Sequence, residues 1–171
     1  WTTMITGQTQ LGHGIEIHHL CKRMCSEGIV LNEVTFISIL EACSHVGLID
    51  EAYYYFATMP KEHGIAPDIE HYNCMVALLS RAGRLLEAEF FIHKMPFYST
   101  MLPWLTLLSA CRFHMDVEAG KKAANNLRIL EPDSKVADAL LANIHVILGQ
   151  WKEVSNLRRI VRSTSDHTAM E

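Results

Sequence analysis

The sequence has few of the residues that interrupt helices or cross-link a fold. Its 171 residues include 5 prolines, 9 glycines and 5 cysteines. Strand-rich folds with many tight turns need more glycine and proline, and an odd number of scattered cysteines favours reduced, buried thiols over a disulfide framework. No apolar run approaches the roughly 18 residues that a membrane-spanning helix needs. We therefore expect a helical protein with no membrane segment.

Charge of one sign and catalytic motifs are also scarce. The chain has 15 Lys and Arg against 19 Asp and Glu, a formal charge of −4, which excludes a strongly electropositive nucleic-acid clamp. A zinc deaminase needs His-x-Glu and Cys-x-x-Cys motifs, and the sequence contains neither. Glycine-rich phosphate loops and paired catalytic carboxylates are missing too. We predict no enzyme activity in this chain and no cofactor.

One possible metal site deserves weighing. His18, Cys21 and Cys25 are spaced by about one helical turn and fit a zinc-binding helix face in principle. Dispersed histidines and apolar-periodic cysteines favour an ordinary, partly buried helix face instead. The sequence therefore predicts no metal site.

What the sequence does contain is an internal repeat. Five segments align at intervals of 35, 36, 32 and 34 residues when one mostly aromatic column is superposed, namely Trp1, Phe36, Tyr72, Trp104 and Asp138. The same alignment produces a glycine column of Gly12, Gly47, Gly83, Met115 and Gly149. It also produces a glutamate column of Glu16, Glu51, Glu87, Ala119 and Glu153. Agreement in three independent columns indicates a true repeat.

Each segment predicts two helices. Phe36, Ile39, Leu40 and Cys43 follow the spacing i, i+3, i+4 and i+7, which places them on one helix face. The glycine column ends this first helix, because a helix often stops at a left-handed residue and glycine has no Cβ to clash there. A second apolar-periodic stretch follows, which in the last segment begins at Trp151. The predicted fold class is all-α: an α-α superhelix, a right-handed solenoid of about five helical hairpins, with the first helices on the concave side.

The repeats resemble the plant pentatricopeptide repeat family, in its class with alternating long and short motifs. The stretches that carry the resemblance are WTTMITG at 1–7, EVTFISILEACSHVG at 33–47, EHYNCMVALLSRAG at 70–83, WLTLLSACRFH at 104–114, LEP at 130–132 and GQWKEV at 149–154. The resemblance implies a truncated standard motif at 1–32, a long motif at 33–68, a short motif at 69–100, extension motifs E1 at 101–134 and E2 at 135–167, and a tail at 168–171. Tetratricopeptide repeats have a similar period, but the varying interval argues against them.

The resemblance also implies an RNA-binding surface. Members of the family bind single-stranded RNA with one nucleotide per repeat, recognised by the fifth and last residues of each motif. These residues pair here as Thr2 with Asn32, Ile37 with Asp68, and Asn73 with Thr100. The first pair resembles one that prefers adenine. The second discriminates weakly because isoleucine has no donor or acceptor, and Asn73 suits a pyrimidine edge. The alternative is that these polar residues merely cap helices.

The extension motifs imply a different partner. Their equivalent residues, Leu105 and Ala139, cannot hydrogen-bond a base, so we expect protein contacts there. The resemblance implies a specificity factor for C-to-U editing of organellar RNA that recruits accessory editing proteins or a deaminase domain. We expect the mitochondrion, with the chloroplast as the alternative, and a fragment whose transit peptide and any deaminase domain lie elsewhere. The competing hypothesis is a tetratricopeptide-like protein scaffold, which the net negative charge favours.

Overall fold

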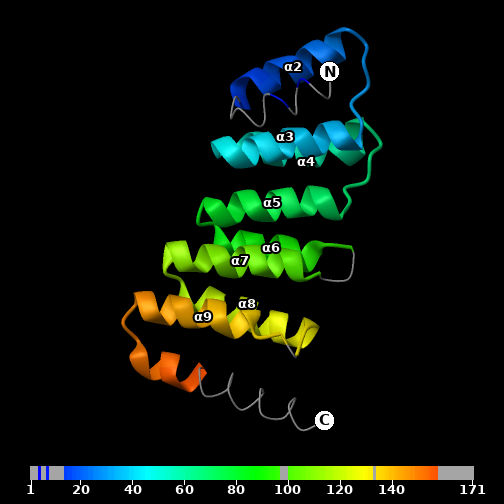
Figure 1. Cartoon of the computed structure of the whole chain (residues 1–171). Helices are drawn as coiled ribbons and strands as arrows, with labels where there is room; N and C mark the ends of the chain where they lie inside the picture. Colours follow the sequence, from blue (N-terminus) through cyan, green and yellow to red (C-terminus); the bar gives the residue numbers. More distant parts are fainter. Residues whose placement is uncertain (1–3, 5–6, 8–13, 97–99, 133, 158–171) are drawn as a thin grey trace. The chain divides into compact units, whose positions relative to one another are not determined.

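The computed structural model describes residues 4, 7, 14–96, 100–132 and 134–157. None of these residues lies in a β-strand, so the predicted all-α fold class is confirmed. The helices are α2 Gly14–Ser26, α3 Glu33–Val46, α4 Ile49–Glu62, α5 Ile69–Arg81, α6 Leu85–Lys94, α7 Met101–His114, α8 Val117–Leu130 and α9 Val136–Ile147 (Figure 1). Residues 151–157 are also helical. Within the described segments, no helix is both long and apolar enough to cross a membrane.

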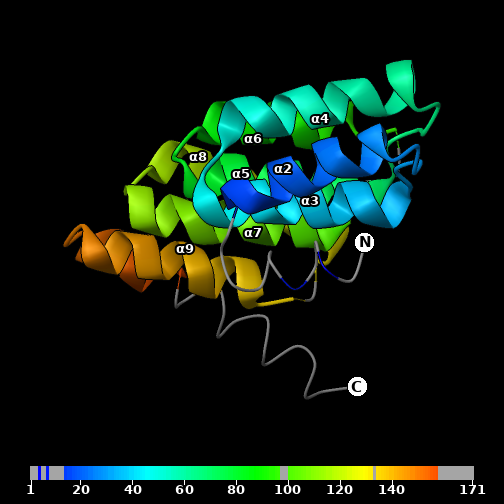
Figure 2. The same cartoon turned by 90° about the horizontal axis from the view of Figure 1, so that it is seen from above.

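The chain forms two compact units, Trp1–Phe97 and Tyr98–Glu171. In the first unit α3 packs against α2, α4 and α5, and α5 also packs against α6. Here α3 stacks on α5, while α4 and α6 lie together on one side of that stack (Figure 2). In the second unit α7, α8 and α9 all pack against one another. Each unit is therefore built from consecutive helical hairpins, as the repeat predicts.

The aromatic column lies in the core at the positions that the structure describes. Phe36 and Trp104 are fully buried. Tyr72 is half-buried, and its ring contacts Phe56 and Phe91 at centroid distances of 5.1 and 6.3 Å. The first helices thus bury the face that their spacing predicts, and each buried aromatic side chain contributes about 1.5–3 kcal/mol from removal of apolar surface from water.

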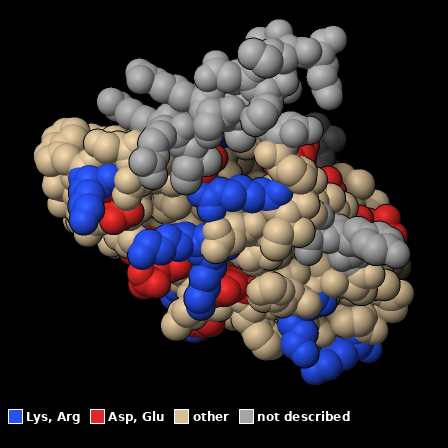
Figure 3. Space-filling view, turned by 90° about the horizontal axis from the view of Figure 1, so that it is seen from below, with Lys and Arg blue, Asp and Glu red and all other residues tan. Residues whose placement is uncertain are grey.

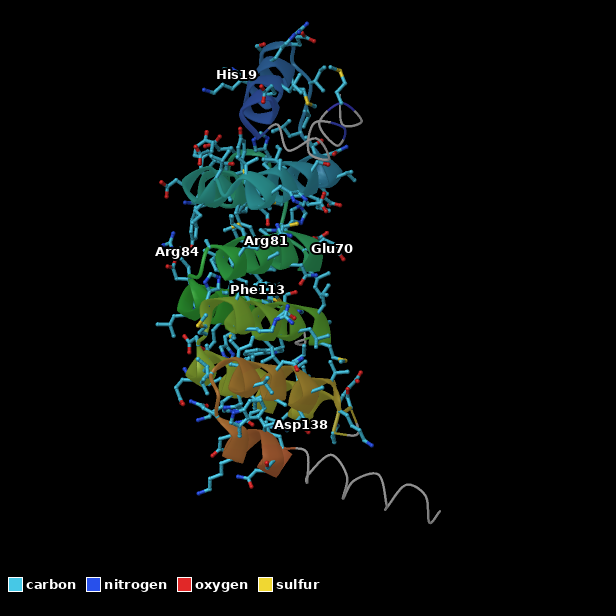
Figure 4. The ribbon with its side chains drawn as sticks, turned by 60° about the vertical axis from the view of Figure 1, so that its left-hand side comes forward. His19, Glu70, Arg81, Arg84, Phe113 and Asp138 are labelled. Atoms are coloured by element: carbon cyan, nitrogen blue, oxygen red, sulfur yellow. The ribbon has the colours of Figure 1, made fainter. Side chains whose placement is uncertain are left out.

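The fifth segment has a charged residue where the other segments have an aromatic one, and that residue is also buried. Asp138 occupies the aromatic column on α9 and is buried (Figure 4). Its carboxylate accepts a hydrogen bond of 2.9 Å from Arg128 Nε on α8, and Arg128 Nη2 contacts the same oxygen. An ion pair therefore replaces the aromatic packing of the other repeats.

The glycine column ends the first helices in the left-handed conformation. Gly47, Gly83 and Gly149 have φ of 82°, 75° and 68°. Met115 holds the same position after α7 with φ of 56°, although its Cβ makes this conformation unfavourable. The backbone geometry of the repeat therefore persists where its preferred residue is lost.

One predicted core residue lies outside the core. Trp151 is 63% exposed, whereas Val154 and Leu157 on the same helical stretch are buried. Trp151 is the first residue of that stretch and lines an open pocket with Lys121 of α8 and the buried His145. The prediction of Trp151 as a core residue is wrong, because at a helix start its side chain faces this pocket.

Candidate nucleic-acid interface

Asn32 caps the N-terminus of α3. Its backbone is extended, with φ of −115° and ψ of 175°. Its Oδ1 accepts hydrogen bonds from the Thr35 backbone N–H at 2.9 Å and from the Thr35 hydroxyl at 2.8 Å. Thr35 is buried and Asn32 is exposed. The cap therefore engages the amide oxygen and leaves the amide nitrogen, with its two N–H donors, on the accessible part of the side chain.

Asp68 holds the same place at the start of α5. Its Oδ1 accepts from the backbone N–H groups of Glu70 and His71 at 3.0 and 3.2 Å, and lies 2.5 Å from His71 Nδ1. Burial alone raises the pKa of Asp68, but the hydrogen bonds from the His71 backbone and ring, with the charge of that ring, outweigh it and lower the pKa below its ordinary value. Asp68 is therefore a carboxylate that can accept a ligand proton donor through its second oxygen.

Thr100 caps α7 without using its side chain. The residue is exposed and extended, with φ of −87° and ψ of 164°, and makes no side-chain cap hydrogen bond. The residue three positions later is Pro103, which has no backbone N–H to donate. Thr100 thus lacks the support that Asn32 and Asp68 receive.

The fifth residues of the motifs lie one turn into the first helices. Ile37 on α3 and Asn73 on α5 are both half-buried, and these two helices pack together. Asn73 Oδ1 is buried and has no hydrogen-bond partner among the described residues. Buried acceptors without a hydrogen bond are rare and lower the stability of a fold. The Asn73 oxygen is therefore available to a hydrogen-bond donor. Thr2 lies outside the described residues, and Asn73 and Thr100 belong to different units.

A pocket beside Asn32 was not expected from the sequence. It has a volume of about 360 Å³ and is lined by Asn32 together with Val30, Leu31, Glu33, Val34, His63 and Ile65. Val30 and Val34 are 78% and 56% exposed. An apolar wall next to an amide suits the flat face and polar edge of a nucleobase. The sequence signal is two valines, Val30 before α3 and Val34 in its first turn, which apolar periodicity alone does not distinguish from core residues.

Charge around this surface is mixed. Glu33, Glu41 and Glu70 are exposed on α3 and α5, whereas Arg81 lies at the opposite end of α5 from Glu70 (Figure 4). Arg81 donates to the carbonyl and hydroxyl oxygens of Ser44 at 3.1 and 2.8 Å. Figure 3 shows a different face, seen from below, on which the described Lys and Arg side chains form separate groups, several of them next to Asp or Glu. Any RNA contact here depends more on bases than on phosphates.

The second unit presents an apolar surface at the equivalent positions. Leu105 on α7 is half-buried and Ala139 on α9 is exposed. Large apolar residues at helical spacing continue each face, and they are 46–71% exposed: Leu102, Phe113, Val136 and Ile147. We call these six residues the α7–α9 apolar surface. No side chain among the six can form a hydrogen bond with a base.

A metal centre finds no support in the described part of the chain. There, no group of three or more His, Cys, Asp or Glu side chains is arranged to hold a metal ion. The side chains of His18, Cys21 and Cys25 lie outside the described residues.

Stacked helical hairpins, with Asn32 and Asp68 capping two successive first helices, define an α-helical repeat protein. Sequence comparison supplies the family. Residues 19–81 match the pentatricopeptide repeat domain, residues 1–29 and 70–97 match the PPR repeat, and residues 114–167 match the E motif. The chain belongs to the pentatricopeptide repeat family and carries an E extension.

Curated relatives match nearly the whole chain. A chloroplastic pentatricopeptide repeat-containing protein of Arabidopsis thaliana is 45% identical over 159 residues, covering 93% of this chain and 19% of the relative. A mitochondrial one from the same plant is 46% identical over 158 residues, with coverages of 92% and 21%. A third is 44% identical over 162 residues, with coverages of 95% and 31%. The chain therefore spans between a fifth and a third of the length of these relatives.

Proposed function

We propose that this chain is part of an organellar single-stranded-RNA-binding protein that selects sites for C-to-U editing. The observation that carries the proposal is the equivalence of Asn32 and Asp68. Both cap a first helix with one oxygen and expose the rest of the head group in successive repeats. A cap alone needs no more than that oxygen, so the exposed amide and carboxylate groups are available to base edges.

The chemistry of each repeat follows from its side chains. Asn32 offers N–H donors beside an apolar pocket, which suits acceptor atoms such as adenine N1 or N3. Asp68 offers an acceptor, while its partner Ile37 adds only apolar contact, so this repeat discriminates through Asp68 alone. Asn73 pairs with a base donor after a rotamer change that brings Oδ1 out of its buried position. Thr2 and Thr100 are the remaining residues that we propose to contact RNA.

The second unit serves a protein partner in this proposal. The α7–α9 apolar surface, which includes Leu105 and Ala139, fits the apolar side chains of an accessory editing protein or a deaminase domain. The segments 101–134 and 135–167 contain α7 with α8 and α9 with residues 151–157 respectively. They are the proposed E1 and E2 motifs.

The site of action in this proposal is an organelle. The names of the relatives divide between chloroplast and mitochondrion, and we propose the mitochondrion first, with the chloroplast as the alternative. Fluorescent fusion of the longest natural chain that contains this segment, imaged in plant cells, distinguishes the two. A cytosolic signal contradicts the proposal.

RNA binding tests the interface directly. Short single strands that differ at one nucleotide are titrated against the longest natural chain, as wild type and as Asn32→Ala. We expect a preference for adenine at the nucleotide of the first motif, and its reduction by about threefold to tenfold in the variant, because one hydrogen bond is lost. Equal binding of all bases by the wild type, with binding of apolar peptides instead, supports the protein-scaffold alternative.

Transcript sequencing tests the editing part separately. In a plant that lacks the protein, we expect one or a few organellar cytidines to lose editing while the remaining sites keep it. Restoration by wild type but not by Leu105→Asp, a substitution on the α7–α9 apolar surface, supports recruitment through that surface. Editing unchanged at every site overturns the editing proposal without affecting the RNA-binding one.

A further inference from the structure

Asn32 and Asp68, the last residues of their motifs, each accept hydrogen bonds from the residue three positions further along the chain. For Asn32 this residue is Thr35, and for Asp68 it is His71; both are almost completely buried. We propose that Thr35 and His71 are positioning residues, which hold the Asn32 amide and the Asp68 carboxylate in the directions that they present to RNA. The proposal rests on the proposed RNA-binding function and adds a determinant of base choice that does not itself contact RNA.

At Asn32 the backbone N–H of Thr35 selects the amide orientation, and the Thr35 hydroxyl adds a second hydrogen bond that holds it. The hydroxyl donates to Oδ1 at 2.8 Å, and the Thr35 backbone N–H donates to the same atom at 2.9 Å. Rotating the amide by 180° places Nδ2, which only donates, against the Thr35 backbone N–H, while the hydroxyl can turn and accept from Nδ2. The flipped state loses the backbone hydrogen bond, so Asn32 presents N–H groups outward and keeps its acceptor inward.

At Asp68 the ring of His71 holds the direction of a carboxylate, whose two oxygens are both acceptors. Nδ1 lies 2.5 Å from Oδ1 and 3.3 Å from the Asp68 backbone N–H. In the tautomer with its proton on Nδ1, the ring donates to the carboxylate. Nε2 lies 3.2 Å from the carbonyl oxygen of Glu33 at the start of α3, so the ring lies between two successive repeats. Oδ1 is thus occupied, and Oδ2 is the outward acceptor.

The next repeat provides a natural contrast. Three positions after Thr100 stands Pro103, which has neither a backbone N–H nor a donor side chain. Accordingly Thr100 makes no side-chain cap hydrogen bond. The hydroxyl of Thr100 rotates freely between donor and acceptor roles, and this repeat should discriminate least through its last residue.

The inference gives the first two repeats opposite roles. Asn32 is held as a donor and favours a base with an acceptor at the contacted edge. Asp68 is held as an acceptor and favours a base with an N–H donor there. If the support is removed, each head group can rotate, and the difference in affinity between matching and non-matching bases shrinks while total affinity falls less.

The test measures base preference in the longest natural chain that contains these repeats. Thr35→Val removes the hydroxyl and keeps the backbone N–H, and Thr35→Ser restores the donor. His71→Phe removes both ring nitrogens, and His71→Asn returns a donor near the position of Nδ1. Thr58→Val is the matched control, because Thr58 is also buried and its hydroxyl donates to the carbonyl of Tyr55, on α4.

We expect Thr35→Val and His71→Phe to reduce the affinity ratio between best and worst base by about threefold to tenfold, each at its own nucleotide only. Thr35→Ser and His71→Asn should restore much of that ratio, and Thr58→Val should leave it unchanged even if it lowers thermal stability. If His71→Phe does not fold, Thr35→Val, Thr35→Ser and His71→Asn still test the proposal.

The proposal is overturned if Asn32→Ala and Asp68→Ala abolish base preference while Thr35→Val and His71→Phe leave it intact. If Asn32→Ala and Asp68→Ala also change nothing, the RNA-reading function itself fails. The two failures are therefore distinguishable in one set of titrations.

Discussion

The hydroxyl of Tyr53 on α4 donates a hydrogen bond of 2.8 Å to Oε2 of Glu87 on α6, joining two repeats across 34 residues of sequence. Glu87 Oε1 accepts from Arg84 Nε at 2.5 Å, and the Arg84 guanidinium lies 5.8 Å from the centroid of the Tyr53 ring. The glutamate column of the repeat thus has a physical role at this position: its carboxylate receives the neighbouring repeat's phenol and its own helix-start arginine.

Removing the phenol tests this link between repeats. We expect Tyr53→Phe to lower the free energy of unfolding by about 0.5–1 kcal/mol, because one partly exposed hydrogen bond to a carboxylate is lost. A double-mutant cycle with Glu87→Gln, followed by urea denaturation, isolates the coupling between the two side chains. Additive effects of the two substitutions would show that the bond contributes nothing to stability.

The same pair predicts behaviour at alkaline pH. Burial, the hydrogen bond to Glu87 and the charge of Glu87 raise the pKa of Tyr53 from 10.0 to about 12. A raised pKa means that the folded state favours the neutral phenol, so this contribution to stability is complete below pH 10 and is lost as pH rises towards 12. Tyrosinate absorbance should show a late-titrating component that Tyr53→Phe removes. Its persistence in that variant would assign the component to another tyrosine.

The repeat register predicted much of this architecture from the sequence alone. Superposing Phe36 with Trp104 identified the buried face, and the column of Gly47 and Gly83 identified where the first helices end. Both follow from local rules, apolar spacing and left-handed backbone, that each residue expresses within its own hairpin. The sequence could not show how the departures are accommodated, because these depend on contacts made only in the folded chain.

The candidate interface shows the same limit. Position within the motif marked Asn32 and Asp68, but not the atom that each uses for its cap, since that depends on the rotamers of Thr35 and His71. Nor did position predict the pocket beside Asn32, which brings together the chain before α3 with residues that follow α4. A polar residue at a helix start is compatible with capping and with recognition, and the structure shows the caps of Asn32 and Asp68.

Thiol chemistry provides a third prediction. Burial raises the pKa values of Cys43 and Cys74 to about 12, with further contributions from Glu51 and from Glu41 respectively. At pH 8 only about one such thiol in ten thousand is a thiolate, the reactive form. We expect both residues to resist iodoacetamide in the folded chain and to react readily in urea, as measured by peptide mass spectrometry. Equal rates in the two conditions would contradict the protection expected from the burial of Cys43 and the partial burial of Cys74.

Backbone strain at Met115 provides a fourth prediction. Met115 has φ of 56° and its side chain is 59% exposed, so replacing it removes little packing. We expect Met115→Gly to raise stability by up to about 1 kcal/mol, because relief of the left-handed strain exceeds the added freedom of the unfolded chain. Gly47→Ala is the reverse control: φ is 82° and no atom lies within 4 Å of the added Cβ. It should lower the melting temperature through backbone strain alone, and a rise there would disprove the explanation.

The ion pair in the aromatic column provides the last prediction. Asp138 is nearly buried, with 12% of its side chain exposed, and Arg128 is its partner. Arg128→Met leaves the carboxylate without its counter-charge, and we expect a loss of about 2–3 kcal/mol, somewhat below the full cost for a completely buried pair. The double variant Arg128→Met with Asp138→Leu removes both charges and fills the space with apolar atoms. It should recover most of that loss in urea denaturation, since the pair replaces the aromatic core residue of other repeats rather than adding to it. A double variant less stable than Arg128→Met alone would mean that the charges themselves, and not the closure of the core, hold this repeat together.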